Sequence, residues 1–200
     1  MKLYYSATSP YVRKVVVSAH ELGLADRLEL LPTKVVPTEP NREYANVAPL
    51  IKVPALVRDD GEAFYDSIVI CEYLDSLGGD KLFPRGEARW RALRLNALAD
   101  GILDAAVLTR YENFVRPENL RWNAWSEGQL LKVDQAVDFL EKNVADLEGL
   151  NIGTIAVGCA LGYLDFRYAD RGWAQKHPKL AAWWKRMAAR PAFEKTVPKG

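Results

Sequence analysis

The first 77 residues alternate short apolar runs, which predict strands, with apolar positions repeated at helical spacing. Pro10 suits the first position of a helix, and apolar residues then recur every three or four positions until Gly23. A second helical pattern begins at Asp66-Ser67 and stops at Gly78-Gly79. The predicted strands are Leu3–Tyr5, Leu28–Leu31, Val53–Val57 and Ala63–Tyr65, with a short irregular helix expected around Asn41–Val47.

These elements follow one another in the order β-α-β-α-β-β-α, which is the thioredoxin-like arrangement. The segment between the last two strands, residues 58–62, contains Asp60-Gly61, a pair typical of hairpin turns. Residues 78–87 contain glycine and proline and predict a linker. We therefore predict an α/β thioredoxin-like domain over residues 1–77, followed by this linker.

Every pattern after the linker is helical. Residues 88–115 form one long periodic stretch, and the sequence from Ser126 to Gln129 has the form of a capping box, which predicts a helix start there. Residues 154–168 carry almost no charge, which predicts a helix buried on all sides. Pro178 opens the last predicted helix. Residues 88–200 are thus expected to form an all-α helical domain.

Composition and charge exclude several classes of partner. The formal net charge is +1, so no basic excess points to nucleic acid, and the uncharged stretch around Ile152–Leu164 is too short to span a membrane. The two cysteines, Cys71 and Cys159, lie far apart outside any Cys-x-x-Cys pair, which is typical of a reducing compartment. With no secretory signal at the N-terminus, we expect a cytoplasmic protein. The two histidines, His20 and His177, lack metal-ligand spacing, so we expect no metal site.

Three segments, Tyr5–Val15, Asn46–Leu56 and Asp66–Leu74, carry a family resemblance. They resemble the strand-to-helix turn, the cis-proline loop and the acidic-serine helix start of bacterial-type glutathione S-transferases, in that order and at that family's spacing. The segments Leu82–Pro84 and Arg190–Phe193 also match, so the resemblance covers essentially the whole chain. It implies a cytoplasmic homodimer that uses glutathione as co-substrate in the detoxification of small electrophiles.

The chain departs from the family pattern at two places. Ile51 stands where the family usually carries glycine, which predicts a different local backbone beside the cis-proline loop. The buried helix usually starts with Thr-x-Ala-Asp, whereas this chain has Thr154 followed by Val157 at the acidic position. Thr154 is still expected to cap that helix, without the reciprocal carboxylate.

Ser9 is the candidate catalytic residue. A serine before Pro10 at a helix start is a favourable N-cap and needs no function. The resemblance, however, places the catalytic serine or cysteine here, with its hydroxyl donating a hydrogen bond to the thiolate of glutathione. The N–H groups and partial positive charge of a helix N-terminus also favour a thiolate. Tyr5 is the main alternative, because other branches of the family use a tyrosine from the first strand, and Ser6 is a weaker one.

The candidate glutathione-binding residues are Lys52, Val53, Pro54, Asp66 and Ser67. The resemblance implies a cis bond before Pro54 that leaves the Val53 backbone free to pair with the cysteinyl part of glutathione. Asp66 can pair with the γ-glutamyl ammonium, and Ser67, at a helix N-terminus, can take the γ-glutamyl carboxylate. Lys52 can meet the glycyl carboxylate, although an exposed, solvated lysine is nearly as good an interpretation.

Two functions stay open. One is an enzyme that conjugates glutathione to an electrophile or uses it as a reductant, and the other is a non-catalytic interaction module of the same fold. A thioredoxin-type reductase needs Cys-x-x-Cys at the first helix, where this chain has Ser9 and Val12. Tyr11, Arg110 and Tyr111 are candidates for lining the electrophile site, although Tyr111 is equally well explained as a core residue.

Overall fold

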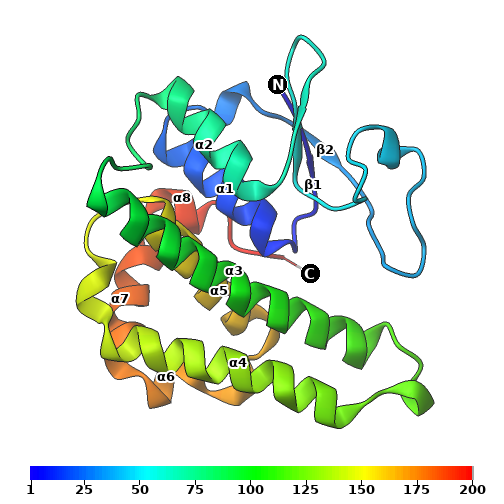
Figure 1. The fold of residues 1–200 in the computed structure, drawn as a ribbon, viewed down its shortest axis with the longest axis vertical. Coiled ribbons are helices and arrows are strands. Elements are labelled where there is room, and N and C mark those ends of the chain that lie inside the picture. Colours follow the sequence, from blue (N-terminus) through cyan, green and yellow to red (C-terminus); the bar gives the residue numbers. More distant parts are fainter. Residues whose placement is uncertain (200) are drawn as a thin grey trace. The chain divides into compact units, whose positions relative to one another are not determined.

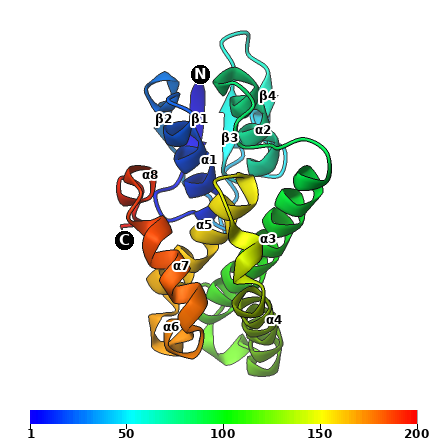
Figure 2. The ribbon, with the colours of Figure 1, turned by 90° about the vertical axis from the view of Figure 1, so that its left-hand side faces the viewer.

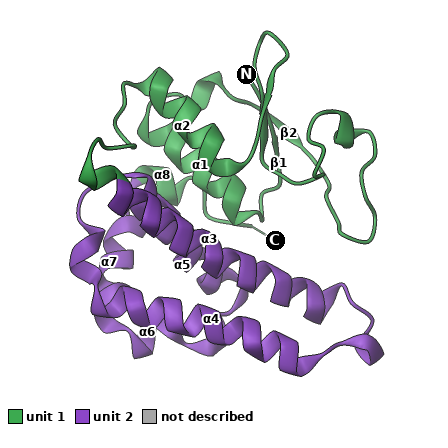
Figure 3. Ribbon diagram, in the orientation of Figure 1, with its two compact units in different colours: residues 1–89, 191–200 green, residues 90–190 purple. Residues whose placement is uncertain are grey.

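The computed structural model describes residues 1–199 and divides the chain into two compact units (Figure 3). The first unit comprises residues 1–89 together with residues 191–199, and the second comprises residues 90–190. The sequence placed the last ten residues in the helical domain, whereas in the structure residues 191–199 group with the first unit. Tertiary contacts made by those residues, rather than their helical pattern, decide this assignment.

The first unit is built on one four-stranded mixed sheet, and Figure 2 labels its strands side by side in the order β2-β1-β3-β4. β2 runs parallel to β1, whereas β3 runs antiparallel to both β1 and β4. The strands are β1 (Lys2–Tyr5), β2 (Glu29–Pro32), β3 (Ala55–Val57) and β4 (Ala63–Phe64). A hairpin at residues 58–62 joins the last two, with Gly61 at a φ of 92° that favours glycine.

Helices pack on this sheet and bury its apolar residues. They are α1 (Pro10–Glu21), α2 (Ser67–Gly78) and α8 (Pro191–Glu194), with short 3₁₀ turns η1 (Ala25–Arg27) and η2 (Tyr44–Asn46). α1 packs against both α2 and α8 (Figures 1 and 2). Leu3, Val15, Leu56, Ile70 and Leu74 are fully buried and form the core between sheet and helices. The predicted thioredoxin-like arrangement of strands and helices is confirmed.

Asp75 holds the segment that follows α2. Its side chain is almost fully buried, and its carboxylate accepts hydrogen bonds from three successive backbone N–H groups: Lys81 at 2.8 Å, Leu82 at 2.8 Å and Phe83 at 3.0 Å. These bonds satisfy both the buried charge and a stretch of backbone that lies outside any helix or strand. The predicted linker is therefore fastened to the first unit at its start.

The second unit is entirely helical. Its elements are α3 (Glu87–Phe114, which starts three residues before the unit), η3 (Glu118–Leu120), α4 (Asn123–Lys142), η4 (Val144–Leu147), α5 (Ile152–Arg167), η5 (Ala169–Arg171), α6 (Trp173–Lys176) and α7 (Pro178–Ala188). Every residue of α5 from Ile152 to Leu164 is buried, as its lack of charge predicts. At Gly153, an added Cβ would lie 2.5 Å from the carbonyl oxygen of Ala92, so only glycine allows this close approach to α3. None of the helices in residues 1–199 has the length and apolar character needed to cross a membrane.

Two helices begin earlier than the sequence predicts. α4 starts at Asn123, and Ser126 lies in its first turn, where its hydroxyl bonds to Asn113 at 3.2 Å instead of capping the helix. α5 is capped by Asn151, whose side chain accepts from the N–H groups of Gly153 and Thr154. The Thr154 hydroxyl returns the bond by accepting from the Asn151 N–H at 2.9 Å. The capping box is therefore present three residues earlier than predicted, with threonine in the place of the carboxylate.

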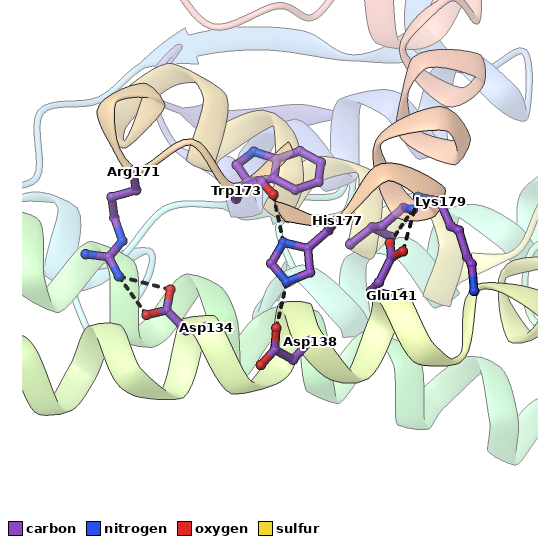
Figure 4. A network of polar contacts seen from close by, with 8 residues as sticks. Asp134, Asp138, Glu141, Arg171, Trp173, His177 and Lys179 are labelled. Atoms are coloured by element: carbon purple, nitrogen blue, oxygen red, sulfur yellow. Dashed lines mark hydrogen bonds and ion pairs between the residues drawn. The ribbon is translucent and has the colours of Figure 1, made fainter. Parts of the chain in front are cut away.

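Acidic side chains along α4 hold the segment that contains α6 and the start of α7 (Figure 4). Asp134 accepts two bonds from the Arg171 guanidinium, at 2.7 and 2.9 Å. Glu141 accepts from the backbone N–H of Leu180 at 2.8 Å, within the otherwise unsatisfied first turn of α7. Between these two contacts lies His177, whose ring nitrogens face the Trp173 carbonyl at 2.7 Å and Asp138 at 2.6 Å.

The contact between Asp138 and His177 makes the stability of the helical unit depend on pH. The hydrogen bond from His177 is the main cause that lowers the pKa of Asp138 from its ordinary value of 3.8. A carboxyl group whose pKa is lower in the folded state stabilises it above the unfolded pKa and loses this effect as the pH falls through the folded pKa. Asp138→Asn should therefore melt at a lower temperature than the parent at pH 7, and the difference should shrink between pH 5 and pH 3.

Circular dichroism melts across this range measure the effect, with Glu127→Gln on the exposed surface of α4 as the matched control. A difference in melting temperature that stayed constant from pH 7 to pH 3 would contradict the assignment.

Candidate functional site

Three predicted segments meet at one edge of the sheet. β1 ends at Tyr5, and the antiparallel register pairs Tyr4 with Ala55 at the beginning of β3. The register of the next hairpin pairs Leu56 with Phe64, the last residue of β4. The chain therefore leaves β1, enters β3 and leaves β4 at the same edge. The turn that follows β1, the loop before β3 and the start of α2 consequently lie together.

Ser9 occupies the N-cap of α1 at this edge. Its hydroxyl oxygen accepts a hydrogen bond from the Val12 N–H at 3.3 Å, so the capping role is present. That role uses the oxygen as an acceptor, and within the described chain the hydroxyl hydrogen has no acceptor. A serine hydroxyl both accepts and donates, so capping leaves one donor available for a ligand. The first turn of α1 contains no acidic residue that would repel an anion beside this donor.

Tyr5, the alternative to Ser9, takes part in an apolar cluster. It is half-buried and packs with Tyr4 and Val16 against the buried residues Val12, Tyr44, Ala48, Val53 and Ala55. This packing gives Tyr5 a structural role in the core of the first unit. The same cluster joins α1 to the loop before β3, because Val12 lies one turn after Ser9 and Val53 lies in that loop.

The loop before β3 presents an unpaired piece of buried backbone. The Val53-Pro54 peptide bond is cis, as the resemblance implies, and Val53 is only 9% exposed. Neither the N–H nor the C=O of Val53 has a hydrogen-bond partner in residues 1–199. Buried backbone groups are nearly always paired, so this one is suited to a ligand that presents an amide of its own. Lys52 extends beside it with an exposed side chain.

A tyrosine that the sequence did not single out holds this loop. The Tyr44 hydroxyl donates to the Lys52 carbonyl at 2.9 Å, and the Tyr44 N–H donates to the Asn41 side chain at 3.1 Å. Burial raises the pKa of Tyr44, which keeps the hydroxyl protonated as a donor. In the sequence, the only sign of this role is a single tyrosine within a polar stretch. The local pattern does not show which carbonyl group its hydroxyl would reach.

Ile51 adopts the backbone that glycine favours. Its φ is 52°, in the left-handed region that β-branched residues rarely occupy, and its side chain packs against the cluster around Val53. The sequence predicted that isoleucine at this position would change the local backbone. The structure instead keeps a glycine-like conformation, and packing of the Ile51 side chain offsets part of its cost.

Asp66 and Ser67 begin α2 at the same edge, as predicted. The Asp66 side chain caps the helix by accepting from the Ile68 N–H at 3.2 Å, and it is exposed to solvent. Ser67 is 2% exposed, and in the described residues neither its N–H nor its hydroxyl is paired. A free N–H and a hydroxyl at a helix N-terminus form a site for a carboxylate, and the neighbouring Asp66 offers a negative charge to an ammonium.

Taken together, the edge offers a hydroxyl donor at Ser9, an amide pairing site at Val53 and groups for both charges of an amino acid at Asp66 and Ser67. This combination suits a peptide-like ligand with a free amino-acid end and an anionic centre. Both cysteines are buried, so neither supplies a thiol at the surface of its unit. Residues 1–199 hold no group of three or more His, Cys, Asp or Glu side chains arranged to bind a metal.

Comparison with known proteins assigns the family. The model of the glutathione S-transferase N-terminal domain matches residues 8–77, and that of the C-terminal domain matches residues 123–186. The chain is 34% identical to an uncharacterized GST-like protein of Escherichia coli K12, YibF, over 99% of this chain and 98% of that protein. The chain belongs to the glutathione S-transferase family. The family resemblance predicted from three short segments is thereby confirmed.

Solved glutathione transferase structures match over the same extent. A family member from Pseudomonas fluorescens Pf-5, crystallised with glutathione, is 45% identical, with a TM-score of 0.97 over 100% of this chain and 99% of that chain. The same family member with bound S-(propanoic acid)-glutathione has a TM-score of 0.92 and matches 100% of both chains. At this identity the likeness extends beyond the fold to the family, whereas the roles of the individual site residues stay predictions.

Proposed function

We propose that this protein is a bacterial-type, cytoplasmic glutathione transferase with serine as its catalytic residue. It activates the glutathione thiol for attack on a small electrophile, as in detoxification, or for glutathione-dependent reduction. The observation that carries this proposal is the unpaired Val53 backbone beside the free hydroxyl hydrogen of Ser9 and the open N-terminus of α2. Two buried cysteines that are not joined in a disulfide support a reducing compartment. The glutathione and S-(propanoic acid)-glutathione bound by the relative from Pseudomonas fluorescens support the ligand.

In this proposal each group at the sheet edge holds one part of glutathione. The Val53 N–H and C=O pair with the cysteinyl backbone, the arrangement that an added strand makes with a sheet edge. The N–H and hydroxyl of Ser67 bind the γ-glutamyl carboxylate, and Asp66 pairs with the ammonium. Lys52 meets the glycyl carboxylate, Pro54 fixes the loop, and the Ser9 hydroxyl donates to the thiolate.

Asp66→Ala should weaken glutathione binding about tenfold, because losing a hydrogen bond to a charged group costs about 1.5–3 kcal/mol, and solvent exposure favours the lower end. Calorimetry measures the dissociation constant, and Asp26→Ala, another exposed aspartate of the same unit, is the matched control. Absence of any heat from glutathione with the parent protein would overturn the enzyme proposal and favour a non-catalytic interaction module.

The reaction itself is tested with a panel of acceptors: aryl halides, enals, quinones and peroxides. Thioether formation with the first three indicates conjugation, whereas oxidation of glutathione by peroxides indicates reductase chemistry. A parent protein that binds glutathione and turns over none of these acceptors would contradict catalysis while leaving the binding site intact.

We also propose that the protein is a homodimer. Within the first unit, α2 and the residue before its cap leave Tyr65, Val69 and Leu77 exposed by 43%, 45% and 40%. Apolar side chains exposed along one element are typical of a protein interface, and a stable dimer buries more than about 1,000 Å². Light scattering at micromolar concentration should give about twice the chain mass of 22.5 kDa. A monomer mass would contradict the proposal, and Val69→Lys should shift the dimer toward that mass.

A further inference from the structure

Arg13 on α1 is buried against the C-terminal segment of the first unit. The residue is 8% exposed, and its Nη2 donates to the Phe193 carbonyl at 3.1 Å in a buried contact. Its Nε donates to the Thr196 hydroxyl at 3.3 Å, and its guanidinium carbon lies 5.5 Å from the centroid of the Phe193 ring. One side chain therefore joins α1 to α8 and to the residues that follow α8 (Figure 2).

The segment that Arg13 contacts is itself held in place. Phe193 is fully buried, and the Thr196 hydroxyl donates to the Ala192 carbonyl at 2.8 Å, which closes the turn after α8. A close-packed aromatic ring moves little, because its neighbours fill the space around it. The segment Arg190–Phe193 carries part of the family resemblance, and its last residue thus provides a fixed point of attachment for α1.

Arg13 also belongs to the turn that begins at Ser9. The Arg13 N–H donates to the Ser9 carbonyl at 3.0 Å, and the Val12 N–H donates to the Ser9 hydroxyl at 3.3 Å. Val12 packs in the cluster that contains Val53, whereas Arg13 reaches Phe193. Because successive side chains of a helix point about 100° apart, these two contacts hold the turn in two different directions. Together they fix the place of the Ser9 hydroxyl.

We propose that Arg13 is a positioning residue for Ser9. By fastening the first turn of α1 to Phe193 and Thr196, it keeps the Ser9 hydroxyl aimed at the glutathione sulfur. The inference rests on the proposed function, because it takes the thiolate as the acceptor of the Ser9 hydroxyl. A hydrogen bond weakens steeply as its distance and angle depart from the optimum, so a first turn that can shift stabilises the thiolate less.

The thiol pKa of bound glutathione, followed by thiolate absorbance, is the readout. Arg13→Met should raise it by about half a unit or more, because a misaligned Ser9 donor stabilises the thiolate less. The Phe193 carbonyl still accepts from the Thr196 N–H at 3.3 Å, so the substitution does not leave this buried carbonyl unpaired. Arg13→Lys, which lacks the planar fork, should raise the pKa by less. Thr196→Val, which removes one acceptor of Arg13 without changing any charge, should raise it too.

A double-mutant cycle with Ser9→Ala separates positioning from a direct effect of the arginine charge. If Arg13 acts through Ser9, Arg13→Met should shift the thiol pKa by less than about 0.2 unit in the Ser9→Ala background. A shift of the same size in both backgrounds would show that the charge acts on the thiolate through space, and would overturn the proposal.

Asp75→Asn is the control for a general loss of stability in the first unit. Asp75 lies near the end of α2 and bonds to the segment that follows it, so its replacement should lower the melting temperature and leave the thiol pKa unchanged. If Asp75→Asn raised the thiol pKa as much as Arg13→Met does, the positioning role would be overturned.

Hydrogen exchange of the protein without glutathione tests the anchoring of α1 separately. The N–H groups of Val12 and of residue 13 should exchange at least about threefold faster in Arg13→Met, whereas that of Val17, one turn further along α1, should change less. Unchanged exchange at both positions would overturn the proposal. A parent protein that does not lower the thiol pKa of glutathione would overturn the proposed function and this inference with it. A lowered thiol pKa in the parent that Arg13→Met leaves unchanged would overturn the positioning role alone.

Discussion

Replacing Ser9 by alanine should raise the thiol pKa of bound glutathione by about one to two units, because a hydrogen bond to a charged group contributes about 1.5–3 kcal/mol. In the proposed function, the Ser9 hydroxyl that caps α1 donates to a neutral thiol in the resting ligand and to a thiolate in the reacting one. Removing the hydroxyl therefore affects ionisation of the glutathione thiol more than it affects binding of glutathione. The dissociation constant of glutathione should change by a smaller free energy than the thiol pKa does.

The loss of turnover at pH 7 should be only several-fold. A thiol with its ordinary pKa near 8.5 is about 3% ionised at that pH. Raising the pKa of bound glutathione toward this value in Ser9→Ala therefore sharply lowers the fraction present as thiolate. The more basic thiolate is also a better nucleophile, with a slope of about 0.4–0.5 in thiol–disulfide exchange, and this offsets much of the loss. Measurements of rate and thiolate absorbance as a function of pH separate the two effects.

Two variants serve as controls for this prediction. Ser9→Thr keeps a hydroxyl at the N-cap and should keep most of the pKa shift and most of the stability. Ser9→Ala also removes the cap bond to Val12, which alone costs about 1 kcal/mol, so melting curves must accompany the kinetics. An unchanged thiol pKa in Ser9→Ala, together with a loss of activity in Tyr5→Phe, would assign the catalytic hydroxyl to Tyr5.

Asp75→Ala should lower the free energy of unfolding by about 3 kcal/mol or more. This is the largest loss of stability that we expect from replacing any single buried polar side chain in the first unit. The substitution leaves three backbone N–H groups, those of Lys81, Leu82 and Phe83, without their acceptor. Each buried donor left unpaired costs about 1–3 kcal/mol, and total stabilities are about 5–15 kcal/mol. Urea unfolding followed by circular dichroism measures the change.

Two further variants distinguish the buried network from a general loss of charge. Asp75→Asn keeps one carbonyl oxygen as an acceptor and should lose less than Asp75→Ala. Asp59→Ala removes an exposed carboxylate that pairs with the N-terminal ammonium at 3.1 Å, and exposed pairs contribute about 0–1 kcal/mol. If Asp75→Ala cost no more than Asp59→Ala, the three bonds would be shown to contribute little.

Local chemistry made much of the fold predictable. Pro10 after Ser9 and Asp66 before Ser67 are strong helix-start signals, and the structure uses both side chains as caps. Where several possible helix starts lie close together, the predicted start differs from the observed start by about one turn. Ser126 has a favourable capping sequence, but α4 begins three residues earlier and the serine bonds instead to Asn113, on α3. Contacts with a neighbouring helix decide such boundaries, and no local pattern contains them.

The candidate site, like the fold, was predictable from the sequence only in part. Local chemistry identified Ser9, Asp66 and Ser67 as helix-start residues, because serine and aspartate cap helices wherever they occur. Their roles toward glutathione, and the role of the Val53 backbone, were implied by the family resemblance. Their meeting at one sheet edge follows from strand register, which depends on pairs such as Tyr4 with Ala55 and Leu56 with Phe64.

By itself the sequence determined the order of the elements, the helix-start chemistry and the family resemblance, because these depend on residues close together in the chain. Only the tertiary structure decided which groups are left unpaired. The unpaired Val53 backbone lies beside Ser9 and Ser67 only because strand pairing brings three separate segments together. Even the Tyr44 bond to Lys52, which spans eight residues, follows from how the loop folds and not from its pattern. Whether a hydrogen bond or charge is satisfied is settled by all the neighbours that packing provides, so it cannot be inferred from any one segment.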